Sequence, residues 1–561
     1  MGTALNLFCD VCTDKTNKDD RKGAYYINET DTSAPQSLMD IKISSKNFVV
    51  LRQNHFFDDY EKIKFLGEGA FGSVFKVRKK ETGAIRALKE ISKEYLYENM
   101  GNEEELKNEI EVLKNLDHPY IMKIYEFYED EKNIYIINEF CGGGDIAGMN
   151  DKFGIFPEFL VKYIMFQVFL AISFLHSNKV VHADIKRENI AYVYTSGNKD
   201  KDEITQFFSD YFNDKELQDE LNEASGLENL SEKALHFVRE LSNFQMKILD
   251  FGSARKKKKS TNEKLTGVTG TVYYCSPEVI KEKYDFECDE WACGVMMYIL
   301  LTGDPPFLGK NEEEVFYNIL NTDLNLNHPK LKNISEECKD LISKLLEKKA
   351  NKRMLASDAL NHNFFKTGIN IGNLLKGNFR ENKTVLRSML KRNFTGKRTG
   401  KFKDVVLAYI SLNFSDENVE KTARNIFMDM TIGKDKKHFL ITKETFVSKM
   451  EQTCKDLSKE EIESIFDKID TNETGNIEYE ELIRALSDKE KILNDKNLKQ
   501  AFSFFDKDKN GSISWNEIAE IVYPEGKIPE NTIKEFLEEI GQKDENMKLD
   551  FSEFKRILLS E

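Results

Sequence analysis

The sequence predicts an α+β protein in which a small strand-rich unit precedes a larger helical unit and an acidic, all-helical C-terminal domain. Apolar residues follow strand spacing from Tyr60 onward. Helical periodicity dominates from about residue 158, and after about residue 417 the chain is acidic and helical to its end. With 561 residues the chain is too long for one hydrophobic core, so we expect several domains.

The strand-rich unit follows a polar N-terminal segment. Residues 1–55 are rich in Asp, Asn, Thr and Ser, so we predict a poorly ordered tail there. The apolar residues that mark the first strands after it are Ile63, Phe65, Val74, Phe75 and Val77.

The first residues of the tail leave its modification open. Asn6 stands where the myristoylation pattern has Ser or Thr, although Gly2 follows Met1 as the pattern requires. Gly2 together with Cys9 and Cys12 would still allow two lipid chains, and stable membrane anchoring needs two signals. We therefore keep both an acylated, membrane-associated tail and an unmodified one.

The composition excludes several classes of protein. Hydrophobic residues make up 40% and charged residues 32% of the chain, as in soluble globular proteins. The formal net charge of -15 argues against nucleic acid as a partner and suits the binding of cations. The 8 cysteines form no regular framework, which indicates reduced thiols and a cytoplasmic location. The chain contains no run of about 18 apolar residues, so we predict no transmembrane helix. We also expect a monomer.

Residues 195–244 look inserted into the larger helical unit. Two groups of apolar residues there follow helical spacing: Ile204, Phe207, Phe208, Tyr211 and Phe212, and then Leu235, Val238 and Leu241. We predict two helices that pack on the larger unit, in preference to a partner-docking device.

A glycine-rich loop lies between two predicted strands. The stretch Leu66–Val74 contains the pattern G-x-G-x-x-G, in which glycines let backbone amides approach phosphates closely. A strand follows this loop, whereas the dinucleotide-binding version of the motif needs a helix. Lys89 on the next strand can pair with the α- and β-phosphates of ATP, and Glu109 on a following helix can orient Lys89.

The stretch His182–Asn189 resembles the catalytic loop of protein kinases. The resemblance implies that Asp184 accepts the proton of the substrate hydroxyl and that Lys186 neutralises the transferring phosphate. Asn189 would complete this catalytic set and bind Mg²⁺ together with Asp250, which begins the motif Asp-Phe-Gly.

Further kinase landmarks follow in the usual order: Ser276-Pro277-Glu278, Asp289, Trp291, Gly294, and Arg353, which in kinases pairs with that glutamate. Together they imply a bilobal protein kinase fold over residues 56–365, and Thr271 after Gly270 indicates a Ser/Thr kinase. The resemblance places these residues around ATP: Leu66, Gly67, Gly69, Gly72, Val74, Ala87, Lys89, Glu109, Glu139 and Cys141.

The kinase motifs depart from the common pattern at three positions. Ala183 replaces the arginine that normally holds a phosphorylated activation-loop residue, so we expect activation without such a phosphate. Arg187 replaces a proline, and the sequence alone offers no interpretation of this change. Asn138 stands at the back of the ATP pocket, which a side chain of this size would leave partly open.

Two acidic residues bear on the protein substrate. Asp145 and Glu188 match positions that in kinases receive basic residues before the target Ser or Thr. The resemblance therefore implies a preference for basic protein substrates, although either carboxylate could equally be a solvated surface charge.

An EF-hand calcium loop spans Asp470–Glu481, with Gly475 at its sharp turn and Glu478 at its ninth position. Its predicted ligands are Asp470, Asn472, Thr474, Asn476 and Glu481. The pattern repeats with Asp506, Asp508, Asn510, Ser512 and Glu517 as predicted ligands, with Gly511 at the turn and Ser514 at the ninth position. A twelve-position pattern that recurs at a fixed period is highly specific for Ca²⁺.

Two further loops at the same period have lost ligands. The stretch from Lys434 carries no carboxylate at its ligand positions, so we predict a helix–loop–helix unit without calcium. In the stretch from Gln542 the first aspartate is lost and Met547 replaces the turn glycine, so we expect a silent or weak site. If neighbouring hands pair, each pair has one working loop, and the calmodulin-like domain over 417–561 binds about two ions.

A kinase followed by four EF-hand-like units resembles the calcium-dependent protein kinases of plants, ciliates and apicomplexan parasites, over residues 56–561. Members of this family have an autoinhibitory junction, and residues 366–416 are the candidate here. This junction is basic and has two apolar stripes at helical spacing: Val385, Leu386, Met389, Leu390 and Phe394, and then Phe402, Val405, Val406, Tyr409 and Ile410.

The resemblance implies that the junction blocks or distorts the kinase at rest and that calcium-loaded EF-hands move it away. A basic amphipathic helix that lies on an anionic membrane is the alternative. Two other functions are possible in principle: a calcium-responsive pseudokinase scaffold, and a calcium buffer with a vestigial kinase. The presence of Lys89, Asp184, Asn189 and Asp250 argues against the first, and the basic amphipathic segment beside the EF-hands argues against the second.

Overall fold

The computed structural model places two kinase-like lobes and a helical C-terminal half within Ile41–Glu561. The described residues are 45–52, 55–69, 72–99, 110–196, 199–257, 264–266, 271–377, 383–388, 401–432, 440–455, 457–522, 537–538, 540–541 and 548–559.

A six-stranded sheet forms the smaller lobe, with the strand order β1-β5-β6-β4-β3-β2. Neighbouring strands run antiparallel except β1, which pairs with β5 in parallel. The buried side chains of Val77, Leu88 and Ile137 belong to the core of this lobe. The elements of the lobe are β1 (Leu51–Arg52), α1 (Phe56–Asp59), β2 (Tyr60–Gly69), β3 (Gly72–Lys79), β4 (Ile85–Ser92), α2 (Lys93–Asn99), β5 (Ile124–Glu129) and β6 (Asn133–Asn138).

The prediction of a poorly ordered tail is wrong for its last part. Residues Ser45–Phe48 form the short helix η1, and β1 extends the sheet beside β5. The ring of Phe48 is 5% exposed because it packs with Tyr409 and Phe504 of the C-terminal half. Tertiary contacts that are distant in sequence therefore order this polar stretch.

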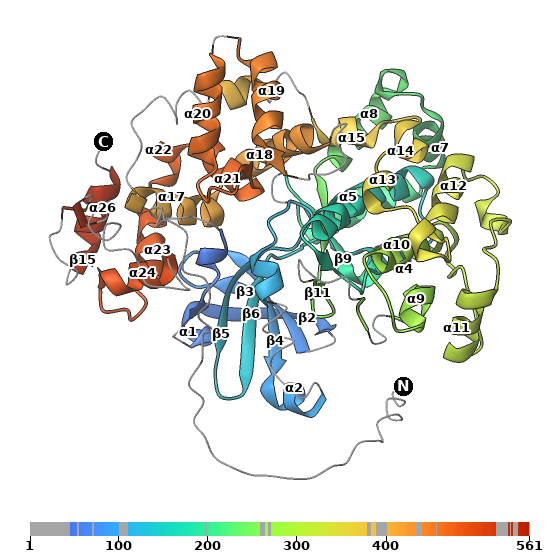
Figure 1. The fold of residues 1–561 in the computed structure, drawn as a ribbon, viewed down its shortest axis with the longest axis horizontal. Coiled ribbons are helices and arrows are strands. Elements are labelled where there is room, and N and C mark those ends of the chain that lie inside the picture. Colours follow the sequence, from blue (N-terminus) through green and yellow to red (C-terminus); the bar gives the residue numbers. More distant parts are fainter. Residues whose placement is uncertain are drawn as a thin grey trace, which may run out of the picture. The chain divides into compact units, whose positions relative to one another are not determined.

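The larger lobe is helical, as the periodicity from residue 158 predicts, and surrounds two apolar helices (Figure 1). Its helices are α4 (Ile146–Phe153), α5 (Glu158–Ser177), α9 (Pro277–Ile280), α10 (Glu287–Thr302), α11 (Glu312–Asn321), α12 (Glu336–Leu345), α13 (Ala356–Ala359), α14 (Asn363–Lys366) and α15 (Ile371–Leu375). By length and composition alone α5 could cross a membrane, although Lys162 and Gln167 interrupt its apolar residues. Since 94% of its apolar stretch is buried, α5 has the surroundings of a core helix.

Two small sheets carry the segments between the lobes. In one, β9 (Ile190–Tyr194) lies between β7 (Gly144–Asp145) and β10 (Phe244–Ile248). In the other, β8 (Val180–Val181) pairs with β11 (Arg255–Lys256). These pairings bring the predicted catalytic loop and the Asp-Phe-Gly motif to neighbouring strand ends.

The segment between β9 and β10 is an insertion that packs on the larger lobe, as predicted. It contains three helices rather than two: α6 (Lys201–Phe212), α7 (Lys215–Glu223) and α8 (Glu232–Leu241). Helices α6 and α8 face each other, since the ring centroids of Phe207 and Phe237 lie 5.0 Å apart and that of Tyr211 lies 4.3 Å from Phe237, a residue outside the predicted second stripe. The additional helix α7 buries Leu217 and Leu221.

The C-terminal half is built from helices and two short strand pairs. Its elements are α17 (Lys401–Phe414), α18 (Glu417–Thr431), β12 (Ile441–Thr442), α19 (Lys443–Thr453), α20 (Lys459–Ile469), β13 (Asn476–Ile477), α21 (Tyr479–Leu486), α22 (Lys489–Ile492), α23 (Asp495–Phe505), β14 (Ser512–Ser514), α24 (Trp515–Val522), β15 (Lys548–Asp550) and α26 (Phe551–Leu559). Strand β12 pairs with β13, and β14 pairs with β15. Each predicted calcium loop is therefore joined to one degenerate loop, as expected if neighbouring hands pair.

Candidate active site and calcium sites

The glycine-rich loop connects β2 to β3. Gly69 pairs with Gly72 across the hairpin, and Gly67 pairs with Val74. A Cβ atom at Gly72 would lie 2.1 Å from the carbonyl oxygen of Glu90, so only glycine fits there. Leu66 lies on β2 beside these glycines. Gly67, Gly69 and Gly72 thus give the hairpin three positions without a side chain, where phosphates could approach the backbone.

Lys89 lies on β4, directly opposite Val74 of β3. Its ammonium lies 3.2 Å from Oδ1 of Asp250. Burial opposes ionisation of Asp250, but Lys89 outweighs it and holds the pKa of this carboxyl below its ordinary value. Asp250 has a φ of 55°, which is strained for a residue other than glycine. The predicted partner of Lys89, Glu109, lies outside the described residues.

The predicted catalytic residues converge on one carboxylate. Oδ2 of Asp184 lies 2.7 Å from the ammonium of Lys186 and accepts a 3.0 Å hydrogen bond from Nδ2 of Asn189. Lys186 also donates to Oγ1 of Thr271 at 3.1 Å. These contacts orient the Asp184 carboxylate before any substrate binds.

Asn189 and Asp250 are placed so that both can ligate a metal ion. The amide nitrogen of Asn189 donates to Asp184, which leaves its Oδ1 as the ligand atom. The backbone carbonyl oxygen of Asn189 accepts from the backbone amide of Leu249 at 2.8 Å, so Asn189 lies beside the residue that precedes Asp250. Two oxygen ligands at adjoining strand ends fit a hard divalent cation that also binds phosphate oxygens.

The backbone of the catalytic loop is held from below by Asp289 on α10. Its carboxylate accepts from the amides of His182 and Ala183 at 2.9 and 2.8 Å. Nε2 of His176 lies 2.9 Å from the same carboxylate, and Nδ1 lies 3.2 Å from Glu290. Burial alone would lower the pKa of His176, but these carboxylates raise it to about 10. Sequence reasoning missed His176 and its role, because a single histidine at the end of a helix carries no motif.

The segment after β6 contains Glu139 and Cys141, two of the residues predicted to lie around ATP. Ala87 pairs with Asn138 between β4 and β6. The backbone amide of Glu139 donates to the carbonyl oxygen of Lys123 at 2.8 Å, and its carboxylate pairs with Lys247 at 2.8 Å. Burial raises the pKa of the Cys141 thiol, so this thiol stays protonated. Asn138 is 4% exposed, and its Oδ1 has no hydrogen-bond partner among the described residues.

The predicted pair of Arg353 with Glu278 is present. Nη2 of Arg353 donates to Oε2 of Glu278 at 3.0 Å, and Nη1 bonds the other carboxylate oxygen. The guanidinium lies 5.1 Å from the ring of Trp291. This buried bidentate pair fixes the segment that follows the activation loop.

The first calcium loop has its predicted shape. Asp470 accepts from the amides of Thr474 and Gly475 at 3.0 and 2.8 Å. Gly475 has a φ of 79°, as the sharp turn requires. Oε1 of Glu481 accepts from the amide of Thr471 at 2.9 Å, which turns the final glutamate back toward the start of the loop. Asn472, Thr474 and Asn476 lie between them on the same loop.

Carboxylates crowd together in the first loop. The pKa of Glu478 is raised to about 7, mainly by burial and further by the neighbouring Glu481 and Glu480. Burial also raises the pKa of Glu481 above its ordinary value. A divalent cation would relieve this repulsion between carboxylates, and an all-oxygen ligand set provides a site for such a cation.

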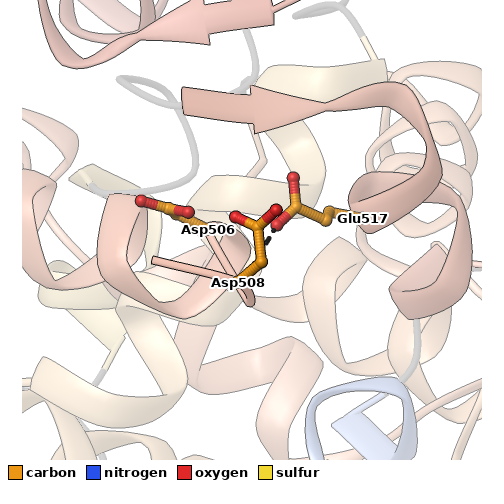
Figure 2. Close-up of side chains that lie close together, drawn as sticks. All are labelled: Asp506, Asp508 and Glu517. Atoms are coloured by element: carbon orange, nitrogen blue, oxygen red, sulfur yellow. Dashed lines mark hydrogen bonds between the residues drawn. The ribbon is translucent and has the colours of Figure 1, made fainter. Parts of the chain in front are cut away.

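The second calcium loop repeats this geometry (Figure 2). Ligand oxygens of Asp506, Asp508 and Glu517 lie within 4.8 Å of one another. Oδ2 of Asp506 accepts from the amide of Gly511 at 2.9 Å, and burial raises the pKa of Asp506. Asn510 donates to Oδ2 of Asp508 at 2.7 Å, and Ser512 donates to Oδ1 of Asn510 at 2.6 Å.

The degenerate loops are only partly described. Residues 433–439 and 542–547 lie outside the described part of the chain, and with them most of the altered ligand positions, including Met547. Asp550 and Glu553 of the last loop bond each other, since the amide of Glu553 donates to Oδ1 of Asp550 at 2.8 Å. Whether either degenerate loop binds calcium stays a prediction.

The first calcium loop touches the kinase domain directly, which no sequence signal indicates. The amide of Glu480 donates to Oδ2 of Asp117 at 2.7 Å, and its carboxylate lies 2.8 Å from the ammonium of Lys123. On α18, Nη1 of Arg424 donates to Oε1 of Gln245 at 2.9 Å. These contacts connect the first predicted calcium loop with residues before β5, and α18 with β10.

The second stripe of the candidate junction lies on α17 and is buried. Phe402, Val406 and Ile410 are each 0% exposed and pack in the core of the second EF-hand pair. Of the first stripe, Val385 and Leu386 are described, and Leu386 is buried; Met389, Leu390 and Phe394 lie outside the described residues.

The site combines a glycine-rich hairpin, the Lys89–Asp250 pair and the oriented carboxylate of Asp184. This combination defines a protein kinase, and paired EF-hands occupy the C-terminal half of the chain. Residues 60–365 match the protein kinase domain, and residues 440–489 and 495–559 each match an EF-hand domain pair. The chain belongs to the calcium-dependent protein kinase family and is a calcium-dependent Ser/Thr protein kinase that uses ATP and a divalent metal.

Relatives cover most of the chain. It is 30% identical over 496 residues to "Calcium-dependent protein kinase 4" of Plasmodium falciparum (isolate 3D7), which covers 86% of this chain and 84% of the relative. It is 30% identical over 456 residues to "Calcium-dependent protein kinase 5" of the same organism, covering 79% and 67%. "Calcium-dependent protein kinase 3" of Plasmodium berghei (strain Anka) is 30% identical over 452 residues, covering 80% and 70%.

Proposed function

We propose that residues 366–416 inhibit the kinase at rest and that calcium binding to the loops at 470–481 and 506–517 removes this inhibition. The observation that carries the proposal is the burial of α17 in the second EF-hand pair. EF-hands change the groove they offer to a helix when calcium binds. A helix that is held by the EF-hands and lies in the chain between the kinase domain and the calcium loops transmits that change to the kinase.

A truncation tests this proposal. A chain that ends at Lys376, directly after α15, lacks the junction and both EF-hand pairs. We expect it to transfer phosphate at the same rate with calcium and with a chelator, whereas the full chain transfers only with calcium. An inactive truncated chain would contradict simple inhibition, since it would mean that the C-terminal half is needed to support the kinase.

Magnesium is the divalent ion that fits the catalytic centre best. Asn189 and Asp250 offer two oxygen ligands, and Mg²⁺ prefers one or two protein oxygens plus phosphates and water. The ion would neutralise charge on the phosphates as the phosphoryl group moves. Phosphate transfer measured with Mg²⁺, with Mn²⁺ or with Ca²⁺ as the only divalent ion tests this, and we expect Ca²⁺ alone to be inactive.

The protein substrates carry basic residues before the target Ser or Thr. Oδ1 of Asp145 accepts the amide of Gly148 at 2.7 Å and so begins α4, which fixes this carboxylate at the edge of the larger lobe. The Glu188 side chain lies in the catalytic loop and is 49% exposed. We expect Asp145→Asn to lower kcat/KM about tenfold for an Arg-containing peptide and to leave an Ala-containing peptide unchanged.

The remaining proposals concern location and assembly. The kinase acts in the cytoplasm as a monomer, with membrane attachment if Gly2 and a nearby cysteine are acylated. Mass measurement of the N-terminal peptide after expression in a eukaryotic cell tests the acylation, and Gly2→Ala is the control.

A further inference from the structure

Arg187 connects the catalytic loop with α4. It lies in η2 (Arg187–Asn189), and its Nη1 donates to Oδ1 of Asn150 on α4. The Asn150 amide is held in turn, because its Nδ2 donates to the carbonyl oxygen of Gly154 at 2.6 Å. Asn150 is 7% exposed and thus cannot swing into solvent. The guanidinium of Arg187 therefore has one defined position.

From this position Arg187 faces an acidic residue of the predicted substrate groove. Its Nη2 lies 3.8 Å from Oε1 of Glu188. The Arg187 side chain is 21% exposed and that of Glu188 is 49% exposed, so the pair is only partly screened by water. Both charges also act on Tyr274: burial and then Glu188 raise the pKa of its phenol, Arg187 opposes the shift, and the net value is about 12.

Asp145 differs from Glu188 in this respect. Its Oδ1 is used by the amide of Gly148, and in the described part of the chain no Lys or Arg forms an ion pair with it. A basic side chain of a substrate would meet a full negative charge at Asp145. At Glu188 it would meet a carboxylate whose field Arg187 already offsets.

We propose that Arg187 is a specificity-determining residue that neutralises Glu188 from within the chain. As a result, Asp145 alone selects for a basic residue before the target Ser or Thr, and the position that faces Glu188 accepts neutral residues. This inference rests on the proposed preference for basic substrates. It also gives a role to the arginine that replaces proline in the catalytic loop.

Matched peptides test the proposal on the full chain with calcium present. Each pair of peptides carries Arg or Ala at one position before the target Ser, and the ratio of their kcat/KM values is measured. We expect Arg187→Gln to raise this ratio about tenfold at one position. Arg187→Lys should keep the wild-type ratio because it keeps the charge. The double variant Arg187→Gln/Glu188→Gln should return to the wild-type ratio, and Arg239→Gln on the exposed face of α8 is the matched control.

Two results would overturn the proposal. If Arg187→Gln lowers kcat for both peptides of every pair and leaves all ratios unchanged, Arg187 only braces the loop. If the ratio rises to the same extent when Glu188 is also removed, Arg187 does not act through Glu188. The underlying substrate preference is tested separately by Asp145→Asn, which fails if it changes no ratio at any position.

Discussion

The catalytic centre and the calcium loops both depend on carboxylates, but these carboxylates have opposite surroundings. Asp184 lies 2.7 Å from the ammonium of Lys186, and Asp250 lies 3.2 Å from that of Lys89. In the calcium loops the ligand carboxylates lie close to other carboxylates, and burial together with the nearby Glu481 and Glu480 raises the pKa of Glu478 to about 7. One region holds its charges in pairs, and the other holds like charges together.

The difference indicates which region responds to a ligand. Paired charges keep their geometry with or without ATP, so the catalytic centre is assembled in advance. Like charges at short range favour a state in which a cation lies between them, so the loops change most when calcium binds. We therefore propose that calcium acts on the loops and leaves the charge pairs of the catalytic centre in place.

The largest effect is expected at the catalytic carboxylate. Asp184→Asn keeps the size of the side chain but removes the acceptor for the substrate proton. We expect kcat to fall about 1,000-fold at saturating calcium. Calcium binding, measured by titration calorimetry on the same variant, should not change. A variant within tenfold of the wild-type rate would contradict the role of Asp184.

The charge network below the catalytic loop should show in stability and its pH dependence. His176 has a pKa of about 10 in the folded protein, above its ordinary value of 6.5, so its stabilising contribution is complete below pH 6.5 and is lost as pH rises toward 10. We expect His176→Gln to lower the free energy of unfolding by about 3 kcal/mol at pH 6, and by much less at pH 10.

Chemical denaturation of the kinase domain within the full chain measures this difference at each pH. His236→Gln, on an exposed part of α8, is the control and should cost less than about 0.5 kcal/mol. A His176→Gln penalty that is the same at pH 6 and pH 10 would show that the imidazole is not charged in the folded protein.

The calcium loops should be sensitive to a change that preserves size and removes charge. Glu517→Gln removes one of three carboxylates that lie within 4.8 Å of one another. We expect calcium affinity of the second loop to fall about 100-fold, with little change in the first loop. Titration calorimetry resolves the two sites. Glu520→Gln, which removes a carboxylate outside the ligand set, is the matched control.

The smallest effect is expected where the two regions meet. Glu480→Gln removes the ion pair with Lys123 but keeps the backbone contact to Asp117. A partly exposed ion pair contributes about 1 kcal/mol or less, so we expect about a threefold change in the calcium concentration for half-maximal activity. The rate at saturating calcium should stay within twofold of wild type. A complete loss of activation would mean that this contact is the main path of coupling.

Most of the candidate site could be predicted from local sequence motifs. Asp184, Asn189 and Asp250 stand in short segments whose spacing follows from the chemistry of phosphoryl transfer, and the structure brings Asp184 and Asn189 into contact. The same holds for the loop from Asp506, whose ligands have fixed positions in twelve residues. Such spacing is readable because each motif folds around its own ligand.

Long-range contacts could not be predicted in this way. His176 pairs with Asp289 across more than a hundred residues, and Phe48 packs against Phe504 from the opposite end of the chain. No local pattern marks these partners, because each depends on how finished elements pack. Arg187 is intermediate: its unusual identity is visible in the sequence, but Asn150 and Glu188 give it meaning only in the folded protein.

We propose that calcium controls the kinase through two loops. The most direct test is phosphate transfer to a peptide across a range of free calcium, for the wild-type chain and for Glu481→Gln/Glu517→Gln. We predict that wild-type transfer rises with calcium and that the double variant shows no rise over the same range while it still binds ATP. A double variant with the wild-type calcium response, or a wild-type chain that is equally active in chelator, would contradict the account.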